Sequence, residues 1–476
     1  MRKKINFLLI LPLVLALPAC NKYLDKPLPA GNINQQNAFI SDNAVSAVVT
    51  GNFLNLVNGG IFGSGSGDMP CETGLYMDEL QSLGTSSSNN VAFYGDAIQY
   101  NNVSTWTDTY SKLYDVNSTL EGIRNTTAVL YYKDQWLGEC YFTRAFLYFY
   151  LTNFYGDVPL ALTSDYTIND KLSRTLQAQV YQQIIADLWQ AQALLNSSYT
   201  DAYGATTKHR NRPDRYTASA LLSKVYCYTQ RWDSAEIWAD TVIAHSDYAL
   251  VPTSQVFTLN NKEIIWSLAM ASTNPSPIQY GLYYGGMPAP IPSGNSPLTY
   301  NVLVSMDTAL VHAFEPNDNR YTNWVRLDSI AGAKPSITYY FPNKYTSSTS
   351  SGENDVVLRL AELYLIRAEA RAHQNNIAGA QADLNAVRTR AGLPNTTAAD
   401  QASLLAAVAK ERRVELFTEC CNRFFDLKRT GTIDSVMTVF APQKHATWSH
   451  YMQLFPLPDN DLIQDPNLTP NPGYQQ

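Results

Sequence analysis

The sequence predicts a mainly α-helical fold with long irregular loops and a few short strands. Apolar residues recur at steps of three and four over much of the chain, which is the spacing of one helix face. At two places in the chain, two such helical stretches form a pair, and a short polar turn separates the two members of each pair. A long stretch between these pairs is rich in proline and aromatic residues and shows no helical period.

The clearer helical pair runs from Val356 to Pro394. The apolar stripe of its first half consists of Leu358, Ala361, Leu365, Ala368 and Ala372. After a polar turn at residues 374–376, the second stripe consists of Ile377, Ala380, Leu384, Val387 and Ala391. Gly392 and Pro394 then act as helix-stop signals. Because alanines let two helix backbones approach closely, this segment predicts an antiparallel helical hairpin.

A second pair of the same kind comes earlier in the chain. Its stripes consist of Ala218, Leu221, Leu222 and Val225, followed by Ala235, Trp238, Ala239 and Val242. Aligning Ala235 with Ala380 places Trp232 opposite Ile377. These alanines are typical of tetratricopeptide repeats, which stack to bury a continuous core. An ordinary helical hairpin would show similar stripes, so the two pairs alone leave both interpretations open.

The remaining elements follow in chain order. We expect helices within residues 35–60, from Trp106 to Val116, from Leu137 to Leu151, from a cap at Ser173 to Asn196, and from Gln401 to about Glu419. The stretch 246–350 is predicted to be an irregular insertion that contains a short strand at Glu263–Leu268. The proline-rich tail from Phe455 to Tyr474 is predicted to be extended.

The composition argues against several classes of function. The 476 residues carry a net charge of −7 without a basic stretch, so nucleic acid is not an expected partner. Charged residues make up only 16%, whereas an average chain has about 25%. Aromatic residues reach 12%, with 31 tyrosines. Such a surface suits neutral ligands that carry hydroxyl or amide groups, and a protein that works outside the cell.

The N-terminus predicts export and lipid attachment. A short basic run precedes an apolar stretch at residues 7–17, which is too short to span a bilayer. The sequence Leu-Pro-Ala-Cys at residues 17–20 resembles a bacterial lipobox, whose cysteine receives acyl chains such as palmitate. We therefore expect residues 1–19 to be a signal peptide, Cys20 to carry the lipid and residues 20–34 to be a tether. A plain secretory signal is the alternative.

No linker of low complexity divides the mature chain, so residues 20–476 are predicted to form one domain. Residues 35–245 would hold the N-terminal helices and repeats, and residues 246–350 the insertion. Residues 351–476 would hold the C-terminal repeat, a helix and the extended tail. Long ordered loops without regular structure usually carry function, so the insertion is the first place to expect ligand contacts.

Patterns of catalysis and metal binding are missing from the sequence. The six histidines show no H-E-x-x-H motif, and Asp78 and Glu79 would point to opposite faces of a strand instead of forming the facing pair of a glycosidase. The cysteines without a lipid role have no metal-ligand spacing; they are Cys71, Cys140, Cys227, Cys420 and Cys421. Buried free thiols are the favoured interpretation, with a disulfide as the alternative. We expect no enzymatic activity, no cofactor and no metal.

Taken together, the motifs resemble the SusD/RagB family of outer-membrane nutrient-binding lipoproteins of the Bacteroidetes. The matching segments are residues 20–25, 153–160, 173–188, 358–370, 411–427, 455–458 and 471–474. The chain departs from the family pattern at residues 420–422, where relatives commonly show Trp-Gly-His, and at Pro470, which replaces a usual glutamine. We expect the charged residues of these motifs to form buried ion pairs between helices, such as Glu419 with Arg423, and not to act in catalysis.

The resemblance implies a helical scaffold of four tetratricopeptide-like units on the cell surface. It implies a TonB-dependent outer-membrane transporter of the SusC type as partner, on which the protein acts as a hinged lid. The implied ligands are oligosaccharides in many members and peptides in others. We favour a glycan and keep a peptide as the alternative; an enzyme and a purely structural surface repeat protein are further alternatives.

The ligand site is expected in residues 68–102 and 273–349, two regions where the family's ligand contacts lie and where polar and aromatic residues mix. The candidate residues are Asp78, Asn90, Tyr94, Tyr283, Tyr284 and Trp324. The aromatic rings would stack on a sugar or peptide face, while the aspartate and asparagine would bond its polar groups. Loop packing is the alternative for each aromatic. Asp318 and Arg320 are set aside as a structural ion pair.

Overall fold

The computed structural model describes residues 37–63, 68–84, 88–269, 283, 287–347 and 352–474. The expected signal peptide, the tether with Cys20, and the candidate Tyr284 lie outside these residues. Within the described part of the chain, no helix combines the length and the apolar character needed to cross a bilayer.

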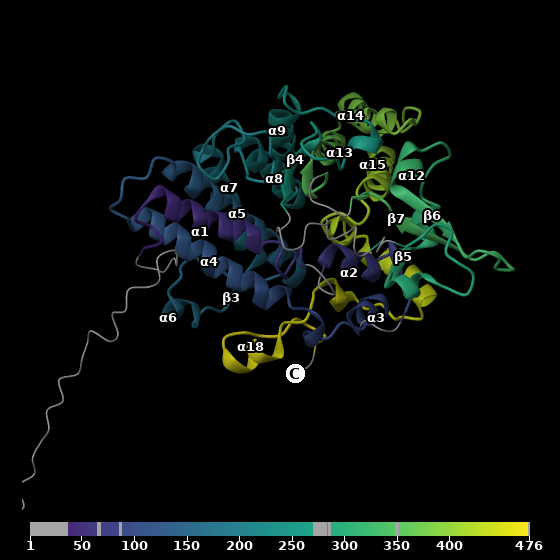
Figure 1. The fold of residues 1–476 in the computed structure, drawn as a ribbon, viewed down its shortest axis with the longest axis horizontal. Helices are drawn as coiled ribbons and strands as arrows, with labels where there is room; N and C mark the ends of the chain where they lie inside the picture. Colours follow the sequence, from purple (N-terminus) through teal and green to yellow (C-terminus); the bar gives the residue numbers. More distant parts are fainter. Residues whose placement is uncertain are drawn as a thin grey trace, which may run out of the picture.

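Long helices form the first half of the molecule (Figure 1). They are α1 (Asp42–Asn55), α4 (Thr105–Asn125), α5 (Lys133–Tyr155), α7 (Gln177–Leu194), α8 (Arg215–Tyr228) and α9 (Trp232–Ile243). α5 packs against α4 on one side and α7 on the other, and nearly all of its side chains from Gln135 onward are buried. Gly156 ends α5 with φ +74°, a backbone conformation that favours glycine.

Both predicted helical pairs are present and stack on each other. α8 and α9 form the first pair, and α13 (Leu360–His373) and α14 (Ile377–Arg390) form the second. The alignment of the pairs is confirmed, because Trp232 and Ile377 are each the first residue of the second helix of a pair. α9 packs against α13, and α15 (Gln401–Glu415) packs against both α13 and α14. Stacked pairs of this kind confirm the tetratricopeptide-like scaffold.

The start of the second pair differs from the sequence prediction. Residues Asp355–Arg359 form strand β8, which pairs antiparallel with β4 (Ile264–Leu268), and the helix begins only at Leu360. Leu358 therefore belongs to a strand and not to the helical stripe. All five residues of β8 are buried, and the branched Val356 and Val357 suit this strand. The partner strand lies about 90 residues away in the sequence, so a local apolar period does not reveal it.

Other helix boundaries also differ from the sequence prediction. Ser173 does not cap α7, because this helix begins at Gln177 after a short strand, β3 (Arg174–Thr175), which pairs with β2 (Val158–Pro159). α15 ends at Glu415, four residues before the predicted end. The tail is not wholly extended, since it contains α18 (Asp459–Gln464).

The insertion contains more regular structure than predicted, apart from the strand β4, which is confirmed. Its further elements are β5 (Val304–Met306), α11 (Thr308–Val311), α12 (Asn319–Trp324), β6 (Val325–Ser329) and β7 (Thr338–Pro342). β6 and β7 form an antiparallel hairpin that stands at the side of the molecule opposite α1 (Figure 1).

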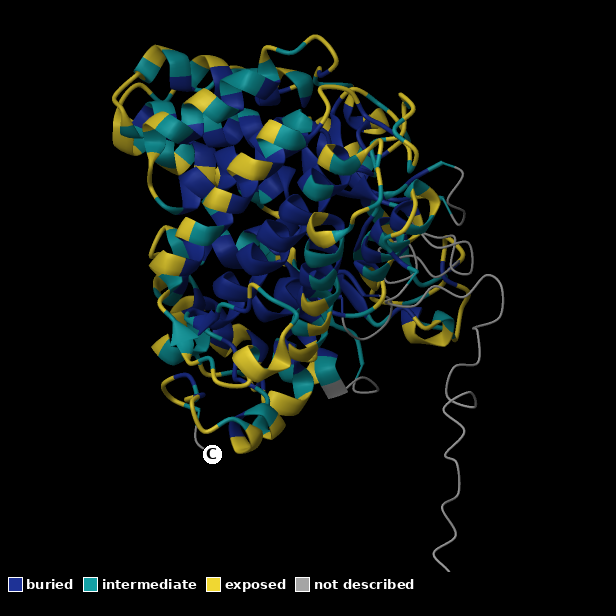
Figure 2. Ribbon diagram, turned by 90° about the vertical axis from the view of Figure 1, so that its left-hand side faces the viewer, coloured by how far each residue is buried: buried dark blue, intermediate teal, exposed yellow. Residues whose placement is uncertain are grey.

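Short helices complete the structure. They are α2 (Met69–Tyr76), α3 (Ser88–Tyr94), α6 (Tyr166–Asn169), α16 (Asn422–Arg429) and α17 (Ile433–Phe440). Figure 2 shows buried residues throughout the interior, with exposed residues on the rims of the helices and loops. The five described cysteines are buried and unpaired, which confirms the prediction of free thiols.

Candidate functional site

The structure brings the two predicted ligand segments side by side. Strand β1 (Leu80–Ser82) pairs antiparallel with β5, so that Leu80 lies opposite Met306. The pairing continues at both ends, where Leu83 N donates to Leu303 O over 2.8 Å and Asp307 N donates to Glu79 O over 2.8 Å. α3 follows β1 and packs against α2 and β1. Loops from both segments therefore meet at one face, which we call the α3 face.

Asp78 lies beneath this face and is engaged by two arginines. It is buried in the turn between α2 and β1, and not on a strand as expected. Arg423 binds it through Nε and Nη2, both over 2.7 Å, and Arg413 binds it over 2.8 Å. Burial pushes the pKa of Asp78 up, but the two arginines outweigh burial and hold the pKa below its usual value. Its carboxylate is thus a structural anchor.

Trp324 and Tyr283 are also buried. Trp324 is 1% exposed, its Nε1 donates to Thr253 O over 2.8 Å, and the Lys344 ammonium lies 4.9 Å from its ring centre. Phe257 packs against it in an edge-on contact. Neither Trp324 nor Tyr283 offers a ring face to a ligand in this conformation. The sequence shows that these aromatics lie in a loop-rich segment, but their burial depends on residues from distant elements.

Of the candidates that the structure describes, Tyr94 is best placed for contact. It stands at the end of α3, is half-buried, and lies against the Lys444 ammonium, which is 5.5 Å from its ring centre. Burial and the nearby carboxylates of Asp307 and Asp96 raise the pKa of its hydroxyl. Asn90, on the preceding turn of α3, is buried.

A cleft beside α3 adds residues that the sequence prediction missed. It has a volume of about 280 Å³ and lies between residues 96–100 and the C-terminal tail; we call it the α3 cleft. Its polar and aromatic lining residues are Tyr76, Asp96, Gln99, Tyr100, Tyr451, Asp459 and Tyr474. Tyr100 is 45% exposed, and the rings of Tyr451 and Tyr474 meet edge to face at 5.1 Å. The tyrosines of the tail were visible in the sequence, but their position beside α3 was not.

Asp96 is the buried carboxylate of this cleft. Its Oδ1 accepts from Lys444 Nζ over 2.8 Å, and its Oδ2 has no hydrogen-bond partner among the described residues. Burial, only partly offset by Lys444, raises the pKa of Asp96 to about 6. Lys444 also donates to Tyr76 O over 2.8 Å and so attaches the C-terminal region to the α2–α3 segment.

A network of buried charges supports the insertion next to the repeats. The Asp318–Arg320 pair is confirmed at 2.8 Å, and Arg320 also binds Glu411 and Glu415 of α15. Attraction to Arg390, Arg359 and Arg320 outweighs burial and keeps the pKa of Glu415 well below its usual value. Since breaking a buried pair leaves a charge uncompensated, this network makes the orientation of the insertion specific.

The predicted pair of Glu419 with Arg423 is wrong. Glu419 binds Arg359 over 2.6 Å and also pairs with Lys344, while Arg423 binds Asp78. Residues four apart in a helix would face each other, but Glu419 lies in the turn before α16, so the helical spacing does not apply. Among the described residues, no group of three or more histidine, cysteine or acidic side chains is arranged to hold a metal ion.

Comparisons with known proteins agree with this architecture. A model of the SusD family matches residues 160–474, and a model described as "Starch-binding associating with outer membrane" matches residues 63–227. SusD-like protein P25 of Formosa agariphila is 25% identical to this chain over 99% of both chains. SusD-like protein P2 of the same organism is 28% identical over 71% of this chain and 73% of its own.

Solved structures show the same fold. A SusD superfamily protein from Bacteroides vulgatus superposes with a TM-score of 0.77 at 20% identity, covering 91% of this chain and 99% of its own. A structure described as a laminarin-binding SusD-like protein superposes with a TM-score of 0.72 at 23% identity over the same shares. The stacked helical pairs and these comparisons define a helical-repeat protein. The chain belongs to the SusD family.

Proposed function

We propose that this protein is a lipid-anchored protein of the outer membrane that faces the cell exterior and captures oligosaccharides. It holds the ligand at the α3 face and delivers it to a SusC-type TonB-dependent transporter, on which it acts as a lid. Family membership supports this proposal, as does the resemblance to a structure described as laminarin-binding.

The observation that carries the glycan proposal is the chemistry of the α3 cleft. Sugars present flat C–H faces, which stack on aromatic rings, and hydroxyl groups, which bond to carboxylates and amides. The cleft and its rim supply both kinds of group, with the exposed ring of Tyr100, the partly exposed carboxylate of Asp459 and the exposed amide of Gln99. Tyr94 on α3 extends this surface toward the loops of the insertion.

The test compares two exposed tyrosines by calorimetry with laminarin oligosaccharides and a panel of other glycans. Tyr100→Ala removes a ring at the cleft, and Tyr166→Ala removes one on α6 that is 76% exposed and not part of the cleft lining. A stacking ring contributes about 1 kcal/mol, so Tyr100→Ala should weaken binding of the recognised glycan roughly fivefold. Tyr166→Ala should bind like the parent.

Two outcomes would overturn the glycan proposal. One is that no glycan of the panel binds while mixed short peptides do, which would favour the peptide alternative. The other is equal loss of binding in both tyrosine variants, which would show that the cleft is not the site.

The transporter partnership is tested separately, by recovering tagged protein from gently solubilised outer membranes. A larger β-barrel protein should come with it, and repeated recovery of this chain alone would argue against the lid role.

A further inference from the structure

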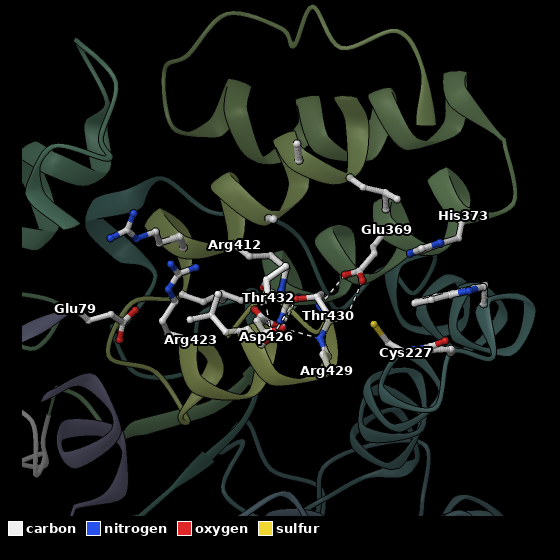
Figure 3. Close-up of a pocket in the computed structure, with 18 residues that line it drawn as sticks. Glu79, Cys227, Glu369, His373, Arg412, Arg423, Asp426, Arg429, Thr430 and Thr432 are labelled. Carbon is white, nitrogen blue, oxygen red and sulfur yellow. Dashed lines mark hydrogen bonds and ion pairs between the residues drawn. The ribbon is translucent and has the colours of Figure 1, made fainter. Parts of the chain in front are cut away.

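A second hollow lies on the repeat side of the molecule and shares no lining residue with the α3 cleft. It has a volume of about 460 Å³ and is bounded by α15, α16 and the turn between α8 and α9; we call it the α15–α16 pocket. Figure 3 shows Glu79 and Arg423 at one end and Cys227 and His373 at the other. Its volume is in the range of sites for small molecules.

Two arginines at one end of this pocket share a single carboxylate. Arg423 and Arg413 both bind Asp78, through three N–O contacts of 2.7, 2.7 and 2.8 Å. No described residue accepts a hydrogen bond from Nη1 of either arginine, and Nε of Arg413 is buried without a partner. Asp78 is thus the one described carboxylate in direct contact with both guanidinium groups, while Asp307 and Asp426 act on them only from beyond 4 Å. The two Nη1 groups remain as N–H donors at the pocket. This is the donor arrangement that binds an anionic oxygen group.

Glu79 adds little negative charge beside this arginine pair at mildly acidic pH. Burial, together with the nearby Asp78, raises the pKa of Glu79 to about 7. Arg423 and Lys344 act in the opposite direction and limit this rise. Its Oε2 accepts from the backbone N–H of Thr418, and its Oε1 has no partner among the described residues. Below pH 7 the neutral Glu79 therefore leaves the arginine pair available.

The rest of the pocket is partly apolar, and its charged residues are paired with one another. In its middle, Arg429 binds Glu369 and Asp426, and Arg412 also binds Asp426 (Figure 3). α15 contributes an apolar wall of Leu405, Ala406 and Ala409. At the far end the ring of Trp232 stacks on His373 with centres 3.9 Å apart, and the hydroxyls of Thr430 and Thr432 line the same pocket. An organic ligand would find ring surface, hydroxyl partners and one cationic end.

We propose that the α15–α16 pocket is a second ligand site, which binds a saccharide through a carboxylate or sulfate group held by Arg413 and Arg423. The choice of a saccharide rests on the proposed function, whereas the anionic group rests on the arginine pair. The pocket thus adds a preference for acidic sugars to a protein whose α3 cleft suits neutral ones.

The test uses calorimetry with trigalacturonate, a sulfated galactotriose and neutral galactotriose at pH 6. Arg413→Gln removes one member of the pair and leaves Asp78 bound by Arg423, so the fold is expected to persist, which circular dichroism checks. Lys410→Gln is the matched control, because it removes the same charge from the same helix at a side chain that is 54% exposed and does not line the pocket. Tryptophan fluorescence, compared between the parent and a Trp232→Phe variant, gives a second readout of occupancy.

An acidic trisaccharide should bind the parent and the Lys410→Gln variant within about twofold of each other. Arg413→Gln should weaken this binding about tenfold or more, because it removes charge-assisted hydrogen bonds. The better of the two acidic probes identifies the anionic group. Equal binding of neutral galactotriose, or equal effects of the two variants, would overturn the proposal. Laminarin binding that depends on Tyr100 would then still support the α3 cleft, so the two proposals fail separately.

Discussion

Buried charges decide which single residues are available to a ligand. Asp78 carries the chemistry that sugar hydroxyls need, but Arg423 and Arg413 engage it and burial hides it. Trp324 has the ring that a sugar would stack on, but it is buried and lies next to the Lys344 ammonium. The arginine partners of Asp78 come from positions about 340 residues later in the chain. No spacing rule in the sequence connects residues so far apart.

Glu79 gives a prediction for the pH dependence of stability. Its pKa is raised to about 7 in the folded state, so the folded protein holds a proton that the unfolded chain releases above its ordinary pKa of about 4.5. The stability that this proton contributes is present at low pH and is lost as pH rises through 7. Glu79→Gln should therefore be more stable than the parent at pH 8, by an amount on the order of 2–3 kcal/mol, and show little gain at pH 4.5.

Urea unfolding of both proteins at pH 4.5, 6 and 8 measures this difference. Other groups titrate in the same range, such as Asp96, but they affect the parent and the variant alike. If the difference in the free energy of unfolding between Glu79→Gln and the parent is the same at every pH, the assigned role of Glu79 is contradicted.

At the scale of elements, small residues set how closely the helices of a pair approach. Ala368 of α13 and Ala380 of α14 are fully buried in one apolar cluster with Leu365 and Leu384. α13 also packs against α9 and α15, so this contact lies at the centre of the stacked repeats. The helical period in the sequence predicts this contact correctly, because the two helices of a hairpin are adjacent in the sequence.

Ala380→Leu tests this close approach. Extra methylene groups in a packed interior force neighbouring side chains apart, so we expect a loss of about 1–3 kcal/mol in the free energy of unfolding. Ala378→Leu on the same helix is the control, since Ala378 is exposed and should tolerate the change with little effect. Thermal unfolding compares the two variants. Similar midpoints for both would show that the two helices do not pack as closely as described.

At the scale of the whole molecule, distant segments assemble the proposed binding face. β1 and β5 join segments that lie more than 220 residues apart, and the region after α17 binds the loop after α3 through Lys444 and Asp96. The insertion is held to α15 by Arg320, and Arg359 of β8 bridges Glu263 of the insertion and Glu415 of α15. The repeats thus support the segments that carry the proposed ligand site.

The expected lipid anchor gives a prediction for the whole protein. Cys20→Ser removes the acyl acceptor, and without acyl chains the protein loses the roughly 0.8 kcal/mol that each buried CH₂ group contributes to membrane attachment. The variant should appear in the soluble fraction after cell lysis, while the parent stays with the outer membrane. Ser435→Ala, a change of similar size at an exposed position of α17, should fractionate like the parent. A variant that stays in the membrane fraction would disprove attachment through Cys20.

The sequence by itself determined the helical repeats, their turns and the ligand class to expect. These depend on local periods of apolar residues and on family motifs, as the matching starts of α9 at Trp232 and α14 at Ile377 show. Only the tertiary structure decided that β8 is a strand, that Asp78 and Trp324 are buried, and that the tail forms one wall of the α3 cleft. The physical reason is that burial and ion pairing depend on partners hundreds of residues away, whereas helix formation depends on neighbours within one or two turns.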